Sequence, residues 1–281
     1  MNKNYGKLLQ QKIGRSDIVT FVGIYDVFSA SIVAKYYDGI FVSGFSFAAS
    51  HYGLPDIGFI AWPDIVSFVQ RIRTVLPEHH LLVDIDDGYC DPEVACHVVS
   101  LLESVGASAV IIEDQKRPRK CGHFDGKQLM DTDEFVQKLK AVLATRQDML
   151  VVARTDASDL DDIKQRTTAF AEAGADIILV DGLKDLGILR RLKDDLGKNI
   201  MFNQIAGGKS PPCTLSQLKH AGVTLVNYST PCLFAAQAAV EQAMKALMEN
   251  DGLLQVHGET AVDLKTCTQL LNDNLSRRDR K

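Results

Sequence analysis

The chain has 281 residues, of which 46% are hydrophobic and 24% are charged, a composition typical of a folded globular protein. Its formal net charge of −5, with only short basic runs, argues against nucleic-acid binding. No apolar run is long enough to span a membrane, and the polar start Met1–Arg15 does not resemble a signal peptide. The six cysteines have no CxxC spacing, which is typical of reduced thiols, so we expect a cytoplasmic protein.

Short β-branched runs alternate with longer amphipathic segments as far as about residue 249. Strands are predicted at Ile18–Gly23, Gly39–Val42, Leu81–Asp84, Ala109–Glu113, Met149–Arg154, Ile177–Val180, Ile200–Asn203 and Thr224–Asn227. Helices are predicted at Val27–Tyr37, Trp62–Val75, Pro92–Val105, Asp133–Ala144, Ile163–Ala173 and Leu215–Ala221.

Continuous apolar strands separated by helices indicate a parallel sheet that is covered on both faces. Eight such units in one chain favour a closed (β/α)8 barrel of the TIM type over an open sheet. We therefore predict one catalytic barrel over residues 1–250 and a C-terminal helical tail over residues 251–281. The tail is expected to pack on the barrel or to reach a neighbouring subunit.

Polar residues stand where most of the predicted strands end, and in a barrel these ends converge on the active site. The strand-end residues are Ser43, Gly44, Asp84, Asp86, Glu113, Arg154, Asp181 and Asn203. Helix capping explains a Ser, an Asp or an Asn at one or two of these positions. It does not explain an Arg, a Glu and an alternating pair of acids together, so the sequence predicts a functional rim.

The acids at this rim predict a divalent cation. Asp84 and Asp86 are two residues apart, which puts their side chains on the same side, and Glu113 ends the next strand. Carboxylates this close repel one another unless a cation lies among them. Oxygen ligands without a His–Cys set suit Mg²⁺, with Mn²⁺ also possible, rather than zinc. The guanidinium of Arg154 is suited to binding the carboxylate of a small substrate through two hydrogen bonds.

A cationic segment, Lys116–His123, follows the strand predicted at Ala109–Glu113. Four cationic residues come immediately before Cys121. Because neighbouring cations lower the pKa of a thiol, we expect Cys121 to exchange a proton near neutral pH. Gly122 and Gly126 would let the segment move as a lid over a bound anion.

Several motifs continue this pattern in order along the chain. They are Gly23-Ile24-Tyr25-Asp26, Ser43-Gly44, Gly53-Leu54-Pro55-Asp56, Asp84-Ile85-Asp86-Asp87-Gly88, Glu113-Asp114-Gln115, Lys120-Cys121-Gly122-His123, Ala153-Arg154-Thr155-Asp156 and Gly207-Gly208-Lys209-Ser210-Pro211. Their order and spacing, over about residues 7–250, resemble the isocitrate lyase/phosphoenolpyruvate mutase superfamily. The resemblance implies a barrel with Mg²⁺ near Asp84, which Asp56, Asp86 and Glu113 reach directly or through water.

The same resemblance implies roles for the residues around the metal. The substrate-binding set is Tyr25, Ser43, Gly44, Phe45, Arg154 and Asn203, and the catalytic set is Cys121, His123, Arg154 and Asp181. The segment that carries Cys121 is expected to close over a small carboxylate substrate. A homo-oligomer is implied as well, a dimer or a homotetramer whose last helices are exchanged between subunits.

The Cys-Gly-His sequence distinguishes branches of this superfamily. The lyases and oxaloacetate hydrolase carry the cysteine, as does a carboxyphosphoenolpyruvate mutase, whereas phosphonate-forming mutases usually have a Lys-and-Asn-Ser segment there. Breaking a carbon–carbon bond leaves an enolate that a thiol can protonate. We therefore predict a Mg²⁺-dependent lyase or hydrolase acting on a small 2-hydroxy- or 2-oxo-dicarboxylate. In this hypothesis Cys121 is the proton donor, and Asp181 is an orienting group or a base.

Some residues depart from the lyase pattern. Asp181 and Ala206 stand where lyases usually have Glu, Arg119 where they often have Lys, and Phe45 where they have a smaller residue. These departures disfavour a tricarboxylate such as methylisocitrate. Phe45 and the cationic segment also leave open a phosphoenolpyruvate mutase-like phosphonate or carboxyphosphonate mutase. A third alternative is a carboxylate-binding protein that has lost catalysis.

Overall fold

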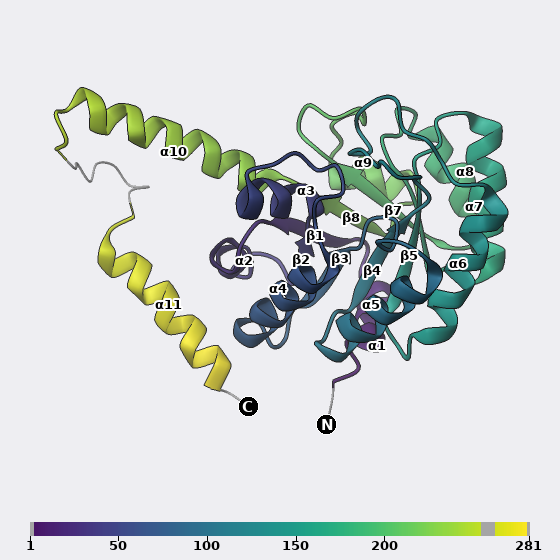
Figure 1. Ribbon diagram of the computed structural model, residues 1–281, viewed down its shortest axis with the longest axis horizontal. Helices are drawn as coiled ribbons and strands as arrows, with labels where there is room; N and C mark the ends of the chain where they lie inside the picture. Colours follow the sequence, from purple (N-terminus) through teal and green to yellow (C-terminus); the bar gives the residue numbers. More distant parts are fainter. Residues whose placement is uncertain (1–2, 254–261, 280–281) are drawn as a thin grey trace.

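Eight parallel strands close into a barrel in the computed structural model, which describes residues 3–253 and 262–279 (Figure 1). They are β1 (Val19–Ile24), β2 (Gly39–Val42), β3 (His80–Asp84), β4 (Ala109–Glu113), β5 (Leu150–Thr155), β6 (Ile177–Val180), β7 (Asn199–Gln204) and β8 (Leu225–Tyr228). Each strand pairs with its neighbours in sequence, and β1 pairs with β8 to close the ring. The predicted TIM-type fold is confirmed, and no predicted strand end is wrong by more than one residue.

Helices connect the strands and cover the outside of the barrel. They are α1 (Tyr5–Arg15), α2 (Val27–Val33), α3 (Gly44–Phe47), the π-helix η1 (Ala48–Tyr52), α4 (Trp62–Val75), α5 (Pro92–Ser104), α6 (Thr132–Thr145), α7 (Leu160–Ala173), α8 (Gly187–Leu196), α9 (Leu215–His220), α10 (Pro231–Glu249) and α11 (Leu264–Asp279). The helix predicted at Val27–Tyr37 ends early, because the N–H groups of Lys35 and Tyr36 bond to carbonyls three residues back and tighten the chain into a turn. The helices α1, α3, η1, α8 and α10 were not predicted from the sequence.

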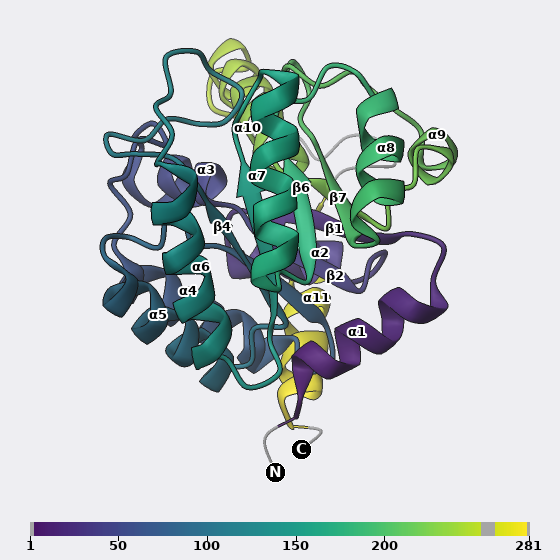
Figure 2. The same ribbon diagram turned by 90° about the vertical axis from the view of Figure 1, so that its right-hand side faces the viewer.

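Alternate residues of each strand face two different apolar layers. On β4, Val110 and Ile112 pack against the surrounding helices, whereas Ala109 and Ile111 face the inside of the barrel. The inner layer also includes Leu9 of α1, which is fully buried. Figure 2 shows α1 at the lower end of the barrel, away from the loops that follow the strands. One end of the barrel is therefore closed by apolar packing, which leaves the other end for chemistry.

The same alternation places a polar layer above the inner apolar layer. On each strand, the residue two positions after the last apolar residue of the inner layer also faces the barrel axis. On seven of the eight strands this residue is polar. These positions are Ser43, Asp84, Glu113, Arg154, Asp181, Asn203 and Asn227, and β1 has Gly23 there. The predicted rim is therefore one ring of side chains that the strand period directs to the barrel axis.

The C-terminal helices extend away from the barrel and then return. In Figure 1, α10 leaves the body of the molecule and α11 runs back toward α2 and α4, which it contacts. Asn274 of α11 donates a hydrogen bond to Ser31 Oγ at 2.8 Å, and Leu270 is buried. The predicted helical tail is present over Leu264–Asp279, although its residues 254–261 and 280–281 lie outside the described residues. The domain boundary at residue 250 and the exchange between subunits stay predictions.

None of the described helices combines the length and the hydropathy that crossing a membrane requires.

Candidate active site

The four predicted metal ligands, Asp56, Asp84, Asp86 and Glu113, come together at the mouth of the barrel. Arg119 reaches into this cluster and binds three of them, with only 1% of its side chain exposed. Its Nη1 lies 2.5 Å from Asp56 Oδ1, its Nη2 3.2 Å from Asp86 Oδ1, and its Nε 2.9 Å from Glu113 Oε1. Arg119 was expected to act as one of the cations beside Cys121, and its contact with the acid cluster was not predicted.

One guanidinium does not fully compensate this many buried acids. Burial raises the pKa of Asp84 and of Asp86, and it raises the pKa of Glu113 to about 7. Asp86 Oδ2 is buried and has no hydrogen-bond partner among the described residues. A buried, unpartnered carboxylate oxygen costs free energy unless a cation or a donor reaches it. The cluster therefore has the charge and the oxygen atoms for a further cation.

The donor chemistry of this cluster fits Mg²⁺. Within residues 3–253 and 262–279, no three acidic, His or Cys side chains are arranged as a complete metal-binding group. That arrangement is not required, because Mg²⁺ usually keeps several water ligands and uses only one or two carboxylates. Asp84, which Arg119 does not bind, lies next to Gly44 and Asp86. Asp84 is therefore the best placed direct ligand.

Arg154, on β5 next to Glu113 of β4, lies among three acids. Its Nη1 is 3.0 Å from Glu113 Oε2, and its Nη2 is 3.0 Å from both Asp156 Oδ1 and Asp181 Oδ2. Burial opposes ionisation of Asp181, but Arg154, His123 and Asn203 together hold its pKa well below its usual range. Asp181 is therefore ionised at neutral pH and is a weak base, which favours an orienting role over proton abstraction.

The expectation for the pKa of Cys121 was wrong in direction. Burial raises it to about 11, although a backbone hydrogen bond from His123 opposes the rise. The preceding cations do not act as expected, because Arg117 binds Asp87 through two hydrogen bonds and Arg119 binds the acid cluster. At neutral pH Cys121 is therefore a protonated thiol, which can donate a proton.

A polar network on β7 and β8 extends the site beyond the predicted residues. Asn203 Nδ2 donates to Asp181 Oδ1 at 2.9 Å, and Asn203 Oδ1 accepts from Ser229 Oγ at 2.5 Å and from Asn227 Nδ2 at 3.2 Å. Asn227 and Ser229 are buried, and neither was predicted as a site residue. The strand period could have identified Asn227, since it occupies the inward position that follows Leu225.

A small cavity of about 30 Å³ lies within the ring, with room for about one water molecule. Its lining includes Ser43, Phe45, Asp56, Asp84, Cys121, His123, Arg154, Asp181, Asn203, Asn227 and Ser229. The Ser43 hydroxyl also accepts a hydrogen bond from Ser46 N and so caps α3. The cavity brings together most of the predicted catalytic and substrate-binding residues, but Tyr25 and Gly44 do not line it.

Residues 116–129, which we call the lid, border the cavity through Cys121, Gly122 and His123. Gly122 approaches the ring so closely that a Cβ atom there would lie 2.1 Å from Asp181 Oδ2 and 2.4 Å from Arg154 Nη2. Lys127 holds the lid to the barrel through Asp156 Oδ1 at 3.1 Å, and it also donates to the Gly122 carbonyl. Only glycine permits this approach at position 122, because any side chain would meet the Arg154–Asp181 pair.

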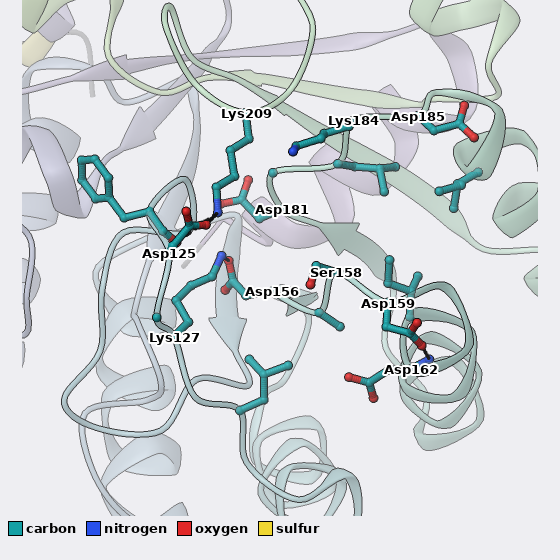
Figure 3. A pocket seen from close by; sticks show the side chains of 18 residues that line it. Asp125, Lys127, Asp156, Ser158, Asp159, Asp162, Asp181, Lys184, Asp185 and Lys209 are labelled. Atoms are coloured by element: carbon teal, nitrogen blue, oxygen red, sulfur yellow. Dashed lines mark hydrogen bonds and ion pairs between the residues drawn. The ribbon is translucent and has the colours of Figure 1, made fainter.

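A larger pocket of about 600 Å³ lies outside the lid (Figure 3). It is bounded by the lid and by the loops after β5 and β6, and it shares Asp181 with the inner cavity. Residues of the lid line both spaces, since Cys121–His123 border the inner cavity and Phe124–Lys127 border the outer pocket.

Comparisons with known proteins agree with the motifs. Residues 9–248 match the family model described as phosphoenolpyruvate phosphomutase. The 2-methylisocitrate lyase of Aeropyrum pernix is 32% identical over a region covering 87% of this chain and 80% of the relative. The carboxyvinyl-carboxyphosphonate phosphorylmutase of Arabidopsis thaliana is 31% identical, covering 85% of this chain and 73% of the relative.

Among solved structures, a crystal structure of 2,3-dimethylmalate lyase, described as a PEP mutase/isocitrate lyase superfamily member, is 26% identical and superposes with a TM-score of 0.89. The match covers 97% of this chain and 93% of that one. The extent of these matches confirms the family assignment made from the motifs. The chain belongs to the phosphoenolpyruvate phosphomutase family, within the isocitrate lyase/PEP mutase superfamily.

Proposed function

We propose that the protein is a Mg²⁺-dependent carbon–carbon lyase or hydrolase acting on a small 2-hydroxy- or 2-oxo-dicarboxylate. The observation that carries this proposal is the inner cavity, where the Cys121 thiol faces the same space as Asp84 and Arg154. A proton donor, a metal-binding acid and a carboxylate-binding cation are the three groups that such a reaction needs. The lyases among the relatives support the same reaction class.

The acid cluster is assigned to the metal. Asp84 would bind Mg²⁺ directly, and Asp56, Asp86 and Glu113 would complete its surroundings, in part through water. When bound, Mg²⁺ supplies electrostatic stabilisation of the negative charge that develops on a substrate oxygen as the bond breaks. Mn²⁺ is the expected substitute, because it accepts the same oxygen ligands.

Cys121 is the proposed proton donor to the carbon atom at which the bond breaks. In a 2-hydroxy acid, or in the hydrate of a 2-oxo acid, the hydroxyl proton leaves to water as its oxygen becomes the carbonyl or carboxyl oxygen of one fragment. The electron pair of the broken carbon–carbon bond stays on the other fragment as an enolate, the Cys121 S–H protonates the carbon of that enolate, and the thiolate then takes a proton from water. A thiol whose pKa is about 11 is fully protonated beforehand at neutral pH, as this role requires. Arg154 and Ser43 would hold the substrate carboxylate, with Asp181 fixing the orientation of Arg154.

The cavity lining favours a small substrate. Phe45 occupies one wall, and Phe234 of α10 supports it in an edge-to-face contact at 6.3 Å. Ala206, which follows β7 outside this lining, lacks the carboxyl group that the lyases usually have at this position. Oxaloacetate and alkylated malates therefore fit the proposal better than a tricarboxylate.

Proton NMR of the purified protein with Mg²⁺ tests the proposal directly. The substrates would be oxaloacetate, alkylated malates and methylisocitrate, each repeated with EDTA and with Cys121→Ala. Loss of one dicarboxylate, prevented by EDTA and by the substitution, is the expected result. Turnover that is unchanged in Cys121→Ala would refute the assigned role of the thiol. Tight binding of a candidate without any turnover would instead favour a carboxylate-binding protein.

A phosphonate or carboxyphosphonate mutase is the second candidate. The phosphorylmutase relative and the cationic residues of the lid favour it. Phosphorus NMR with phosphoenolpyruvate and phosphonopyruvate separates the two candidates, because a mutase moves the signal between ester and phosphonate positions. No movement with either compound would remove this candidate.

We further propose that the protein acts as a homo-oligomer, a dimer or a tetramer with exchanged C-terminal helices. No residue of α10 is buried in the single chain, although Val240, Met244 and Met248 are large and apolar. An exposed apolar surface of this kind usually marks a protein interface. The nearly complete exposure of α10 therefore supports contact with a second copy of the chain.

A further inference from the structure

The two ring nitrogens of His123 have different surroundings. Nδ1 accepts a hydrogen bond from the backbone N–H of Lys209 at 2.9 Å. A backbone N–H can only donate, so Nδ1 carries a lone pair and the proton of the neutral ring lies on Nε2. Nε2 faces Asp181 Oδ1 across 3.4 Å, and His123 lines the inner cavity.

We propose that the turn Gly207–Lys209 holds His123 as a neutral imidazole and presents its Nε2–H as a hydrogen-bond donor to an oxygen of the substrate. The inference rests on the proposed function, because it assigns His123 a role in that reaction. In this role His123 is not a base, since its only lone pair is occupied by the Lys209 N–H. Gly208 and Lys209 are positioning residues that act through the ring.

The turn approaches the ring more closely than a side chain would allow. A Cβ atom at Gly208 would lie 2.6 Å from His123 Nδ1 and 3.0 Å from Cε1. The lack of a side chain at this position is therefore what lets the Lys209 N–H reach Nδ1. Gly208 N also donates to the Ile205 carbonyl at 3.0 Å, which fixes the turn independently of the ring.

On the other side of the imidazole, Nε2 lies close to Asp181 but does not form a normal hydrogen bond with it. The 3.4 Å distance to Asp181 is long, and Nε2 is buried with no hydrogen-bond partner among the described residues. Asp181 is already engaged by Arg154 and by Asn203. A buried donor without a hydrogen-bond partner costs free energy, and a ligand atom that accepts its hydrogen bond removes that cost. The Nε2–H is therefore available to a substrate oxygen.

Lys209 also contacts the lid through its side chain. Its Nζ donates to the carbonyl of Phe124 at 3.2 Å and to Asp125 Oδ1 at 2.6 Å, immediately after His123 (Figure 3). Lid closure and orientation of the ring therefore involve the same residue. The two contacts can be separated, because replacing the side chain leaves the backbone N–H in place.

Nitrogen NMR of the full-length protein labelled with ¹⁵N-histidine tests the inference without any substrate. The chain has seven histidines, and His123→Gln identifies the His123 signals by their loss. At pH 8 we expect a neutral ring protonated on Nε2, both in the wild type and in Lys209→Ala. Gly208→Ala should mix the two neutral forms, because the new methyl group displaces the ring. A wild-type ring protonated on Nδ1, or on both nitrogens, would overturn the inference.

Two substitutions of His123 test its role in turnover. Gln places an amide N–H near the position of Nε2, whereas Asn places one near the position of Nδ1. With the substrate identified by the NMR panel, His123→Gln should retain about tenfold more kcat/KM than His123→Asn, as expected for one hydrogen bond. Equal losses, or better activity with Asn, would refute the donor role. The labelling result stands whether or not the proposed reaction is correct, so the two proposals can fail separately.

Discussion

At the level of single residues, burial sets the chemistry of Cys121. The pKa of its thiol is raised to about 11, so the thiolate fraction at pH 7 is very small and grows about tenfold with each pH unit. Alkylation of Cys121 by iodoacetamide should therefore be slow at pH 7.5 and should still be rising at pH 9.5. Mass spectrometry of peptides gives the rate, with the exposed Cys90 as an internal comparison. A rate that levels off below pH 9 would contradict the raised pKa.

Arg119 is the second residue whose surroundings lead to a prediction. Replacing it with Gln would leave Asp56, Asp86 and Glu113 buried around a neutral group. Removing one partner of a buried ion cluster destabilises strongly, so we expect Tm in EDTA to fall by on the order of 10 °C. Mg²⁺ should then raise Tm more in Arg119→Gln than in the wild type, because the ion can neutralise the same acids.

Differential scanning fluorimetry with EDTA and with excess Mg²⁺ measures both effects of the Arg119 substitution. Arg117→Gln is the matched control, since Arg117 lies on the same lid but binds only Asp87 and is 40% exposed. An equal response of the three proteins to Mg²⁺ would show that Arg119 and the ion do not act on the same acids.

At the level of elements, the lid is held closed by a few contacts. Lys127 joins the lid to Asp156, whose side chain is fully buried. A charged hydrogen bond of this kind shifts the equilibrium between the closed and open lid by about tenfold or more. Lys127→Met should therefore speed chymotrypsin cleavage after Phe124 by roughly tenfold. Lys140→Met, an exposed substitution on α6, is the control and should leave the rate unchanged. Equal cleavage of both variants would place the main restraint of the lid elsewhere.

The strands and the inward ring could be predicted from the sequence because both depend on local patterns. An apolar run such as Ile177–Val180 marks a buried strand, and the two-residue period then directs Asp181 to the barrel axis. The helix α8 was missed although it is amphipathic, and the four-residue α3 is too short to show a helical period.

The properties of the lid could not be predicted, because they depend on how it packs. The sequence places cations beside Cys121, but it does not show that Arg117 turns to Asp87 and Arg119 to the acid cluster. Neutralised in this way, they no longer dominate the thiol, and burial decides its pKa. The Lys209–His123 contact joins residues 86 positions apart, a distance that no local pattern describes.

At the level of the whole molecule, α10 links the active site to a surface that is exposed in the single chain. Its first turn supports the cavity wall, since Phe234 packs on Phe45. Farther along, Val240, Met244 and Met248 are spaced four residues apart and so share one face, and each is more than half exposed. An interface on this face would hold α10 in place and, through Phe234, would fix the position of Phe45.

Met244→Lys puts a charge in the middle of that apolar face and should dissociate the oligomer, since an unpaired charge in an apolar interface is costly. Gln242→Lys adds the same charge on the opposite side of α10 and should leave the assembly intact. Light scattering after size-exclusion chromatography gives the mass of each protein. A wild type that elutes with the mass of one chain, or a Met244→Lys variant that stays assembled, would mean that this face is not the interface. If Met244→Lys does dissociate, its turnover should also fall, because the Phe234 that supports Phe45 then lies on a helix without a partner.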